Sequence, residues 1–392
     1  MKFAAASSQE PDLTQAIAAV QRELVGQLDG AAVDLVMVFV SHEHRAQFPT
    51  LAAQLHEHIP SRVLLGSVAE TIIAGECEWE SGPAIAVWAA ALPEYELRPF
   101  DIQFESTPDG VICSGIPEEL ADDADRVRAF LMLGEPYSSA PNAVIDRFGD
   151  EFPETPVIGG MASGASSPGE NCLFFGNDAV PTGAVVVALL DGPPIYTLVS
   201  QGCRPVGETY VVTRAERNVV LELGGKPALQ RVQEVYQAAS AEDKKLLESG
   251  LHLGVAMSEY RDSFGRGDFL VANVLGADRN SGAIATGNHV RKGQTVQFHV
   301  RDAASADVDL TSLLERTKAA HPSGVEAALL FSCNGRGSRM FPEAHHDASA
   351  IQRVLGPLPL AGMFAAGEIG PVGPQNYMHG FTASVALFVK PR

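Results

Sequence analysis

The chain has 392 residues, of which 46% are hydrophobic and 19% are charged, and its formal net charge is −20. This length exceeds one ordinary hydrophobic core, so we expect two domains in a compact globular protein. The acidic surface repels phosphate backbones and anionic lipids, so neither nucleic acid nor a membrane is an expected partner.

Five cysteines are scattered along the chain and form no C-x-x-C pair. This usage predicts a reducing compartment and argues against a structural zinc site or a disulfide framework. The first residues lack the long apolar centre of a signal peptide, and the longest apolar run, residues 84–92, is about half as long as a membrane helix needs to be. We therefore expect a cytoplasmic protein.

Over the first hundred residues the hydrophobic pattern alternates between helical spacing and the continuous apolar runs of buried strands. It predicts a helix over 12–28, a strand over 33–40, a helix over 45–59, and strands over 62–66 and 84–92. The order strand, helix, strand, strand then recurs twice. The second copy has these elements at 126–134, 142–152, 156–160 and 183–190, and the third has them at 324–333, 347–355, 358–362 and 381–389.

This recurrence predicts an internal threefold repeat. Each copy of strand, helix, strand and strand would contribute to a mixed sheet flanked by helices, which places the protein in the α/β class. Segments 33–92, 126–190 and 324–389 should then share one strand order.

The residues between the second and third copies have a different pattern. Segment 196–225 alternates short strands and turns, 227–250 predicts one helix that ends at Gly250, 268–302 predicts a meander of three strands, and 309–321 predicts an amphipathic helix. We expect two firmly packed domains, residues 1–222 and 223–392.

A glycine-rich loop follows the first apolar strand of the third copy, in the sequence "LLFSCNGRGSRMF" (329–341). Loops at the carboxyl ends of strands are the usual ligand sites of α/β proteins. Gly335 and Gly337 permit positive φ angles, and the guanidinium of Arg336 between them suits a carboxylate. Asn334 joins these ligand-binding candidates, whereas Arg339 is expected to face solvent. The alternative is a structural turn in which Arg336 pairs with an acidic side chain of the protein.

The second motif, "GEIGP" (367–371), places Glu368 on an apolar turn, where a carboxylate is costly unless it is paired. Glu368 would pair with Arg336 or receive the ammonium group of a ligand, with Asn376 and His379 supplying neutral hydrogen bonds nearby. An amino acid carries both charges on adjacent atoms. The two motifs together therefore predict a site for an amino acid or a similar small zwitterion or carboxylate.

Cys333 in the first motif supports an enzymatic alternative. Its thiolate would be favoured by Arg336, with His379 as general base and Glu368 orienting that histidine. We predict that Cys333 is not an essential nucleophile, because no base is adjacent in sequence and buried cysteines are common.

Two further clusters of ionisable residues have structural explanations. "ECEWE" (76–80) predicts an exposed strand face with three carboxylates, and "EAHHD" (343–347) predicts a solvated helix start rather than a metal site. The glycine-rich turns lack the strand-to-helix context of a dinucleotide site, and no Walker pattern occurs. We therefore expect neither a metal nor a cofactor.

Several long and irregular motifs resemble the FIST family of sensory domains. "LLFSCNGRG" and "GMFAAGEIGPVGPQNYMHGFTASVALF" are similar to its C-terminal domain, and "LLGSVAETIIAGECEWE" (64–80), "VIGGMASG" (157–164) and "QGCRPVGETYVVTRAERNVVLELGGKPAL" (201–229) are similar to its N-terminal domain. The resemblance covers nearly the whole chain. It implies an intracellular input module for signal transduction that binds small ligands, with amino acids the usual suggestion.

Members of this family sit beside kinase, cyclase or F-box modules. Here the two FIST-like halves account for the length of the chain, so the output would act through a signalling protein in trans. Eukaryotic relatives that act as substrate receptors suggest a protein-interaction scaffold as a further alternative. The function predicted from the sequence is thus a small-ligand sensor, with the enzyme and the scaffold as alternatives.

Overall fold

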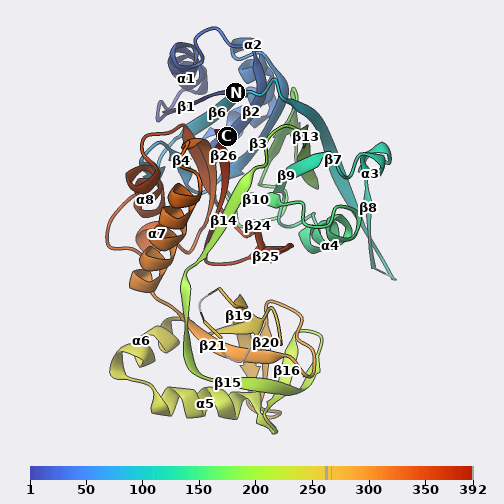
Figure 1. The fold of residues 1–392 in the computed structure, drawn as a ribbon, viewed down its shortest axis with the longest axis vertical. Helices are drawn as coiled ribbons and strands as arrows, with labels where there is room; N and C mark the ends of the chain where they lie inside the picture. Colours follow the sequence, from blue (N-terminus) through green and yellow to red (C-terminus); the bar gives the residue numbers. More distant parts are fainter. Residues whose placement is uncertain (109, 261–263, 266, 391–392) are drawn as a thin grey trace. The chain divides into compact units, whose positions relative to one another are not determined.

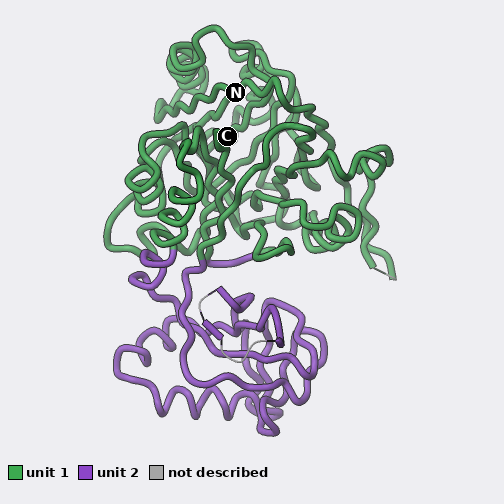
Figure 2. Tube along the Cα trace, in the orientation of Figure 1, with its two compact units in different colours: residues 1–200, 310–378, 382–392 green, residues 201–309, 379–381 purple. Residues whose placement is uncertain are grey.

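The computed structural model describes residues 1–108, 110–260, 264–265 and 267–390. The chain forms two compact units, coloured separately in Figure 2. Unit 1 comprises residues 1–200, 310–378 and 382–392, and unit 2 comprises residues 201–309 and 379–381. Most of unit 2 is therefore a single insertion in the chain of unit 1.

Unit 1 is built from three repeats (Figure 1). The first contains β1 (Lys2–Ser8), α1 (Leu13–Leu28), β2 (Val33–Ser41), η1 (His42–Gln47), α2 (Phe48–His58), β3 (Ser61–Ala69), β4 (Ile72–Ala74), β5 (Cys77–Trp79) and β6 (Ile85–Ala91). The second contains β7 (Tyr95–Thr107), β8 (Gly110–Ser114), α3 (Glu119–Asp122), β9 (Val127–Gly134), α4 (Pro141–Glu151), β10 (Val157–Met161), β11 (Leu173–Phe175), β12 (Asp178–Val180) and β13 (Ala184–Asp191). The third contains β14 (Tyr196–Gln201), α7 (Ala303–Ala320), β22 (Val325–Cys333), η2 (Gly337–Arg339), α8 (His346–Leu355), β23 (Leu360–Ala365), β24 (Glu368–Val372), β25 (Gln375–His379) and β26 (Thr382–Val389).

The three repeats have the same strand order. Their central strands lie in the orders β6-β2-β3, β13-β9-β10 and β26-β22-β23. In each repeat the two strands joined by a helix are parallel, and the returning strand is antiparallel to the first of them. The predicted threefold recurrence and the mixed α/β class are confirmed.

Each sheet is completed by a hairpin from another repeat, which the sequence did not predict. Hairpin β4–β5 of the first repeat pairs with β23, β11–β12 of the second pairs with β3, and β24–β25 of the third pairs with β10. The exchange is cyclic, because every repeat gives one hairpin and receives one. Parts of the chain that are far apart in sequence therefore share a sheet edge.

A glycine stands at the same place in each repeat, where the second central strand lies between the first central strand and the incoming hairpin. These residues are Gly66, Gly159 and Gly362. A Cβ atom placed there would lie 2.6, 1.7 and 1.8 Å from the carbonyl oxygens of Val38, Met132 and Leu330, respectively. These distances are far inside van der Waals contact, so the close approach of the two central strands requires glycine here.

The central strands are buried on both faces, as their continuous apolar runs predicted. On β22, Ala327, Leu329 and Phe331 face a core shared by the three sheets, whereas Ala328 and Leu330 pack in a second cluster with residues of α7 and α8. Helices therefore cover the outer face of the third sheet.

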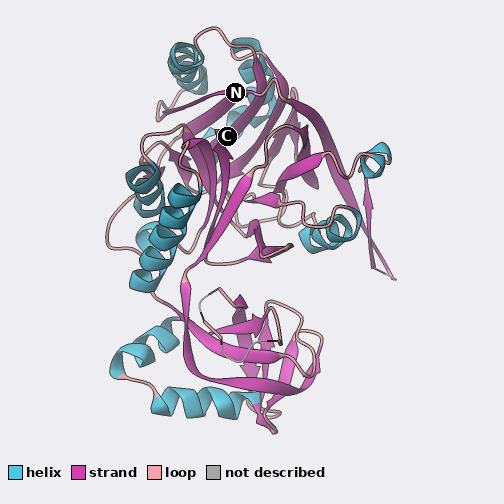
Figure 3. Cartoon of the chain, viewed as in Figure 1, coloured by secondary structure: helices cyan, strands magenta, loops and turns pink. Residues whose placement is uncertain are grey.

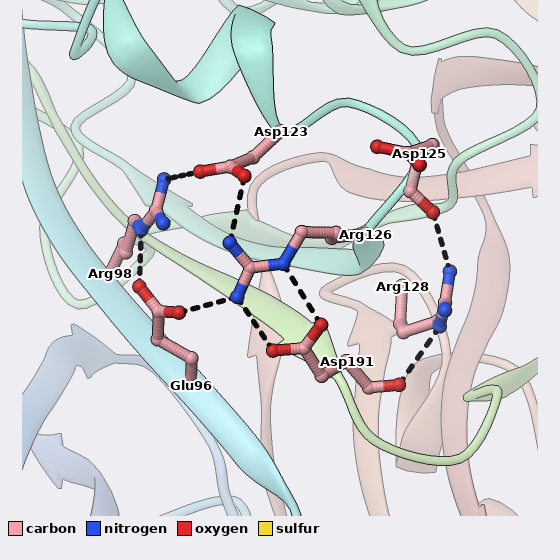
Figure 4. Close-up of polar contacts among 7 residues, drawn as sticks. All are labelled: Glu96, Arg98, Asp123, Asp125, Arg126, Arg128 and Asp191. Atoms are coloured by element: carbon pink, nitrogen blue, oxygen red, sulfur yellow. Dashed lines mark hydrogen bonds and ion pairs between the residues drawn. The ribbon is translucent and has the colours of Figure 1, made fainter.

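A network of ion pairs joins the ends of three strands in the second repeat (Figure 4). Arg126 contacts Asp123, Glu96 of β7 and Asp191 of β13, each at 2.7 Å, and Arg98 contacts the same Glu96 and Asp123. The side chains are partly exposed, so a single pair contributes little to stability. Shared carboxylates nevertheless link β7, β9 and β13 at one end of the sheet.

Unit 2 contains β15 (Cys203–Glu216), β16 (Val219–Leu223), β17 (Lys226–Pro227), α5 (Ala228–Ala238), α6 (Ala241–Ser249), β18 (His252–Ala256), β19 (Phe269–Asp278), β20 (Ala283–Thr286) and β21 (Thr295–Arg301) (Figure 3). The strand order is β15-β21-β18-β19-β20-β16, and β15 also pairs with β16. The long β15 thus closes the sheet into a ring.

The single helix predicted over 227–250 was wrong, because α5 and α6 are separate helices. The Ser240 side chain accepts a hydrogen bond from the Asp243 amide at 3.0 Å, which caps α6 and starts a new helix. The boundary predicted between residues 222 and 223 falls within β16, and the division into domains 1–222 and 223–392 stays a prediction.

We expect Gly362→Ala to lower the free energy of unfolding by about 1–3 kcal/mol or more, since the new methyl group would displace backbone atoms of β22. Gly26→Ala in α1 is the control, because a Cβ atom there meets no described heavy atom within 4 Å. It should raise stability by about 0.5–1 kcal/mol. Urea titration followed by circular dichroism measures the free energy of unfolding of both variants. Equal values would contradict the close approach of Gly362 to the backbone of β22.

Candidate functional site

The glycine loop after β22 lies at the carboxyl edge of the third sheet, as predicted. Gly337 has a φ of 58°, and a Cβ atom there would lie 2.6 Å from Cε2 of Phe364 and 2.7 Å from Oε1 of Glu80. Both the backbone conformation and the space around it require glycine. The loop therefore turns tightly and brings Arg336 back over the end of the sheet.

Arg336 forms a buried, bidentate ion pair with Asp347 of α8. The Nε–Oδ2 and Nη2–Oδ1 distances are both 2.7 Å, and the two side chains are 0% and 1% exposed. Asp347 also accepts hydrogen bonds from Ser332 Oγ at 2.6 Å and from His346 Nδ1 at 2.9 Å. Burial opposes ionisation of Asp347, but the guanidinium and these donors outweigh it and hold the pKa of this carboxyl well below its usual range.

The solvated helix start predicted for "EAHHD" was wrong for Asp347. The residue lies in the first turn of α8, where a carboxylate is favourable, but the glycine loop places Arg336 against it and excludes water. The predicted alternative, in which Arg336 pairs with an acidic group of the protein, thus has Asp347 as its partner.

Glu368 opens β24 and is completely buried. Its Oε2 accepts hydrogen bonds from the Thr382 amide at 3.0 Å and from Thr382 Oγ1 at 2.9 Å. The Glu368 carboxyl group also forms a hydrogen bond with the side chain of Cys333. Burial raises the pKa of Glu368 to about 8, against smaller opposing effects of Thr382, Cys333 and Arg336. The side chain is therefore a neutral acid at neutral pH.

The other two repeats show what the fold itself needs at this position. On β24, Glu368 lies across the sheet from the residue that follows the close-approach glycine of the second repeat. Ile72 on β4 and Leu173 on β11 lie at the equivalent positions of their own hairpins. All three side chains are 0% exposed. Because two of the three positions hold an aliphatic residue, packing does not call for a carboxyl group here, and burying one costs free energy.

A second buried acid, Glu78, reaches the site from the exchanged hairpin of the first repeat. The exposed strand face predicted for "ECEWE" was wrong at this residue, which is 2% exposed. Its Oε1 accepts from the Ala348 amide at 2.9 Å, and its Oε2 has no partner among the described residues. Burial and then the charge of Asp347 raise the pKa of Glu78 to about 8. Sequence reasoning missed Glu78 because the hairpin exchange that places it is not local.

The remaining predicted residues have different surroundings. Cys333 is half-buried, its Sγ accepts a hydrogen bond from the Gly335 amide at 3.4 Å, and its side chain forms a hydrogen bond with Glu368. Asn334 has a buried Oδ1 without a partner among the described residues. Asn376 bonds through its amide to the backbone of Thr155 and Val157 in the second repeat.

Two of the basic candidates also have defined places. Arg339 is 56% exposed, as expected, and pairs with Glu70. His379 is counted with unit 2. The predicted ligand contacts of Asn376 and His379 stay predictions. Within the described part of the chain, no group of three histidine, cysteine, aspartate or glutamate side chains is arranged to hold a metal ion.

Comparison with known families identifies the chain. The model of the FIST N domain matches residues 34–226, and that of the FIST C domain matches residues 228–371. The chain belongs to the FIST family. FIST domains are generally sensory domains, and the two matches together span nearly the whole chain. The junction between them falls within unit 2, so the two FIST regions and the two compact units divide the chain differently.

Two mycobacterial proteins are similar to this FIST protein over its length. An uncharacterized protein of Mycobacterium tuberculosis (strain H37Rv) is 42% identical over 390 residues, which cover 99% of this chain and 100% of that protein. An uncharacterized protein of Mycobacterium bovis is 40% identical over 382 residues, which cover 97% and 96% of the two chains. None of the helices in the described residues is long and apolar enough to cross a membrane.

We expect Asp347→Asn to destabilise the FIST protein by about 3–5 kcal/mol, because it leaves the buried guanidinium of Arg336 without its counter-ion. Glu70→Gln removes the partner of the exposed Arg339 and should cost less than about 1 kcal/mol. Urea denaturation compares the two variants. Similar losses would show that burial of the Arg336 pair has no energetic consequence.

The contribution of Glu368 to stability should fall as the pH rises from about 5 to about 8. Glu368 stays protonated in the folded state up to about pH 8, whereas in the unfolded chain it ionises near its usual value of 4.5. The folded state therefore holds a proton that the unfolded state has lost, which costs roughly 1.4 kcal/mol per pH unit for this group. Glu368→Gln should remove this share of the slope, and Glu343→Gln, on an exposed loop, should not. Urea midpoints of the parent and of both variants at about pH 5.5, 6.5 and 7.5 measure the change of stability with pH. If stability changes with pH equally steeply in all three proteins, the raised pKa of Glu368 is refuted.

Proposed function

We propose that the protein is a small-ligand sensor of the FIST type whose ligand, an amino acid or a similar small zwitterion or carboxylate, binds beside Glu368. The observation that carries the proposal is the Glu368 carboxyl group. It is fully buried, and it stands where the two equivalent repeats have aliphatic side chains. A costly group that the fold does not need points to a ligand.

The charges around Glu368 favour a zwitterion. Asp347 already balances Arg336, and Glu368 is neutral at neutral pH, so the cluster has little net charge before a ligand arrives. On binding, Glu368 would release its proton to solvent and its carboxylate would pair with the ligand ammonium group, while the ligand carboxylate would face the positive charge of Arg336. We propose the buried Oδ1 of Asn334, on the loop that carries Arg336, as a second acceptor for the ammonium group. We propose that occupancy is passed to a signalling protein in trans.

The proposal predicts a pH profile that identifies the ligand class. Pairing with an ammonium group requires ionised Glu368, so the affinity for a zwitterion should rise about tenfold per pH unit below about pH 8 and level off above it. A simple carboxylate would instead accept a hydrogen bond from the neutral acid, and its affinity should fall above about pH 8. The measurement is a thermal-shift screen of the twenty amino acids and simple carboxylates, followed by calorimetry at several pH values.

Glu368→Gln should weaken zwitterion binding by more than tenfold and flatten its pH profile, because the variant has no proton to release. Glu343→Gln and Arg339→Ala, both at exposed side chains, are the controls and should bind like the parent. The proposal fails if no compound in the screen raises the melting temperature, or if Glu368→Gln binds with the affinity and pH profile of the parent.

The enzymatic alternative, with Cys333 as nucleophile and His379 and Glu368 in support, stays a prediction. A protonated Glu368 does not take a proton from a neighbouring thiol or imidazole, which favours binding over nucleophilic catalysis. In the sensor, Cys333→Ser should leave ligand binding largely intact. Stoichiometric loss of a measured turnover after alkylation of Cys333 would favour the enzyme instead.

A further inference from the structure

The second repeat has a strand edge that no other part of the described chain covers. Strand β8 is the last strand of its sheet and pairs with β7. Outside that pairing, the described residues make one hydrogen bond to its backbone, from Thr107 Oγ1 to the Gly110 carbonyl at 3.0 Å. The hairpin β7–β8 extends away from the rest of unit 1 (Figure 1), so alternate N–H and C=O groups of β8 face solvent.

The outer part of this hairpin is an addition to the common pattern of the repeats. Strands β1, β7 and β14 hold the same place, because each pairs with the returning strand of its own repeat. β1 has seven residues and β14 has six, whereas β7 has thirteen, of which the last five, 103–107, pair with β8. Phe104 and Cys113 pack on the core of the second sheet, so the inner face of the hairpin has a structural role. The open edge of β8 is not explained by that packing.

The edge also lacks the usual protection. Natural proteins guard exposed strand edges with lysine, proline or a β-bulge, because an open edge pairs readily with other strands. The sequence of β8, GVICS, contains neither lysine nor proline, and its register with β7 is continuous. Val111 is 42% exposed and Ile112 is 54% exposed, so aliphatic side chains lie on both faces of the strand. An unprotected edge of this kind indicates a strand that another strand covers in the functional assembly.

Charge and symmetry favour a second copy of this chain as the partner. With a formal net charge of −20, two copies repel each other over most of their surfaces. Because β8 carries no charged residue, contact along this strand avoids close like-charge pairs. A strand that pairs antiparallel with its own copy is related to it by a two-fold axis, so one contact covers both edges and the assembly closes.

We propose that two copies of the chain pair antiparallel through β8 and form one continuous sheet across a two-fold axis. An axis at Ile112 pairs all five residues of each strand. It places Ile112 opposite Ile112 of the second copy, Val111 opposite Cys113, and Gly110 opposite Ser114. The contact does not depend on the function proposed for Glu368, and the dimer would hold two such ligand sites.

Sedimentation velocity of the full chain tests the dimer. Five paired residues form a small interface, so we expect a weak equilibrium between the 41.5 kDa monomer and its dimer, resolved between about 1 and 200 μM. Ile112→Lys places two ammonium groups opposite each other at the axis and should weaken dimerisation more than tenfold. Val308→Lys on α7 is the matched control, because Val308 is a similarly exposed aliphatic residue, 53% accessible. It should dimerise like the parent, and melting curves of the two lysine variants should overlay.

Cysteine crosslinking locates the axis. Ile112→Cys should give a disulfide-linked dimer under mild oxidation, because residues directly opposite each other have Cβ atoms about 4.5–5.5 Å apart. Glu105→Cys is the control. Glu105 lies opposite Ile112 on β7, and in the dimer it would lie three strand spacings, about 14 Å, from its copy. It should crosslink no more than the parent, which has five cysteines of its own.

Two results would overturn the pairing through β8. One is a chain that stays monomeric over the whole concentration range, and the other is a dimer that forms equally well in Ile112→Lys. A strand of another protein would then be the occupant of the edge. Equal crosslinking of Ile112→Cys and Glu105→Cys would overturn the register.

Discussion

The architecture of unit 1 depends on the close approach of the two central strands at one glycine in each repeat. At Gly66, Gly159 and Gly362 the second central strand pairs on one side with its own repeat and on the other with a foreign hairpin. No side chain fits against the first central strand at these positions, and the hairpins complete the neighbouring sheets on the other side. The same exchange brings Glu78 of the first repeat to the carboxyl edge of the third sheet, where Arg336 and Asp347 form their buried pair.

The sequence was sufficient to predict those features of the fold that local hydrophobic periodicity encodes. The three repeats, the burial of their central strands and the loop at the end of β22 all follow from apolar runs and glycine placement. The exchanged hairpins have strands of only three to five residues and owe their positions to partners far away in the chain, so no local pattern reveals them. Glu78 was assigned to solvent for this reason. Asp347 was assigned to solvent because it opens a helix next to polar residues, and only its pair with Arg336 of the glycine loop buries it.

Internal repetition also supplies a comparison that a single-copy fold lacks. A buried carboxyl at Glu368 could be ascribed to its surroundings, but Ile72 and Leu173 show that the same surroundings accept an aliphatic side chain. The departure from the common pattern, rather than the residue type itself, separates a requirement of function from a requirement of folding.

The cyclic exchange also shapes how the chain folds as it is synthesised. Hairpin β4–β5 leaves the ribosome early, but its partner β23 is made near the end of the chain. Until β23 arrives, Ile72 and Ile73 lie on an edge without its partner strand, and such edges pair readily with other chains. A second copy carries an identical β23. The contact that closes one molecule can therefore join two, so the topology that builds the site also contains a route to domain-swapped oligomers.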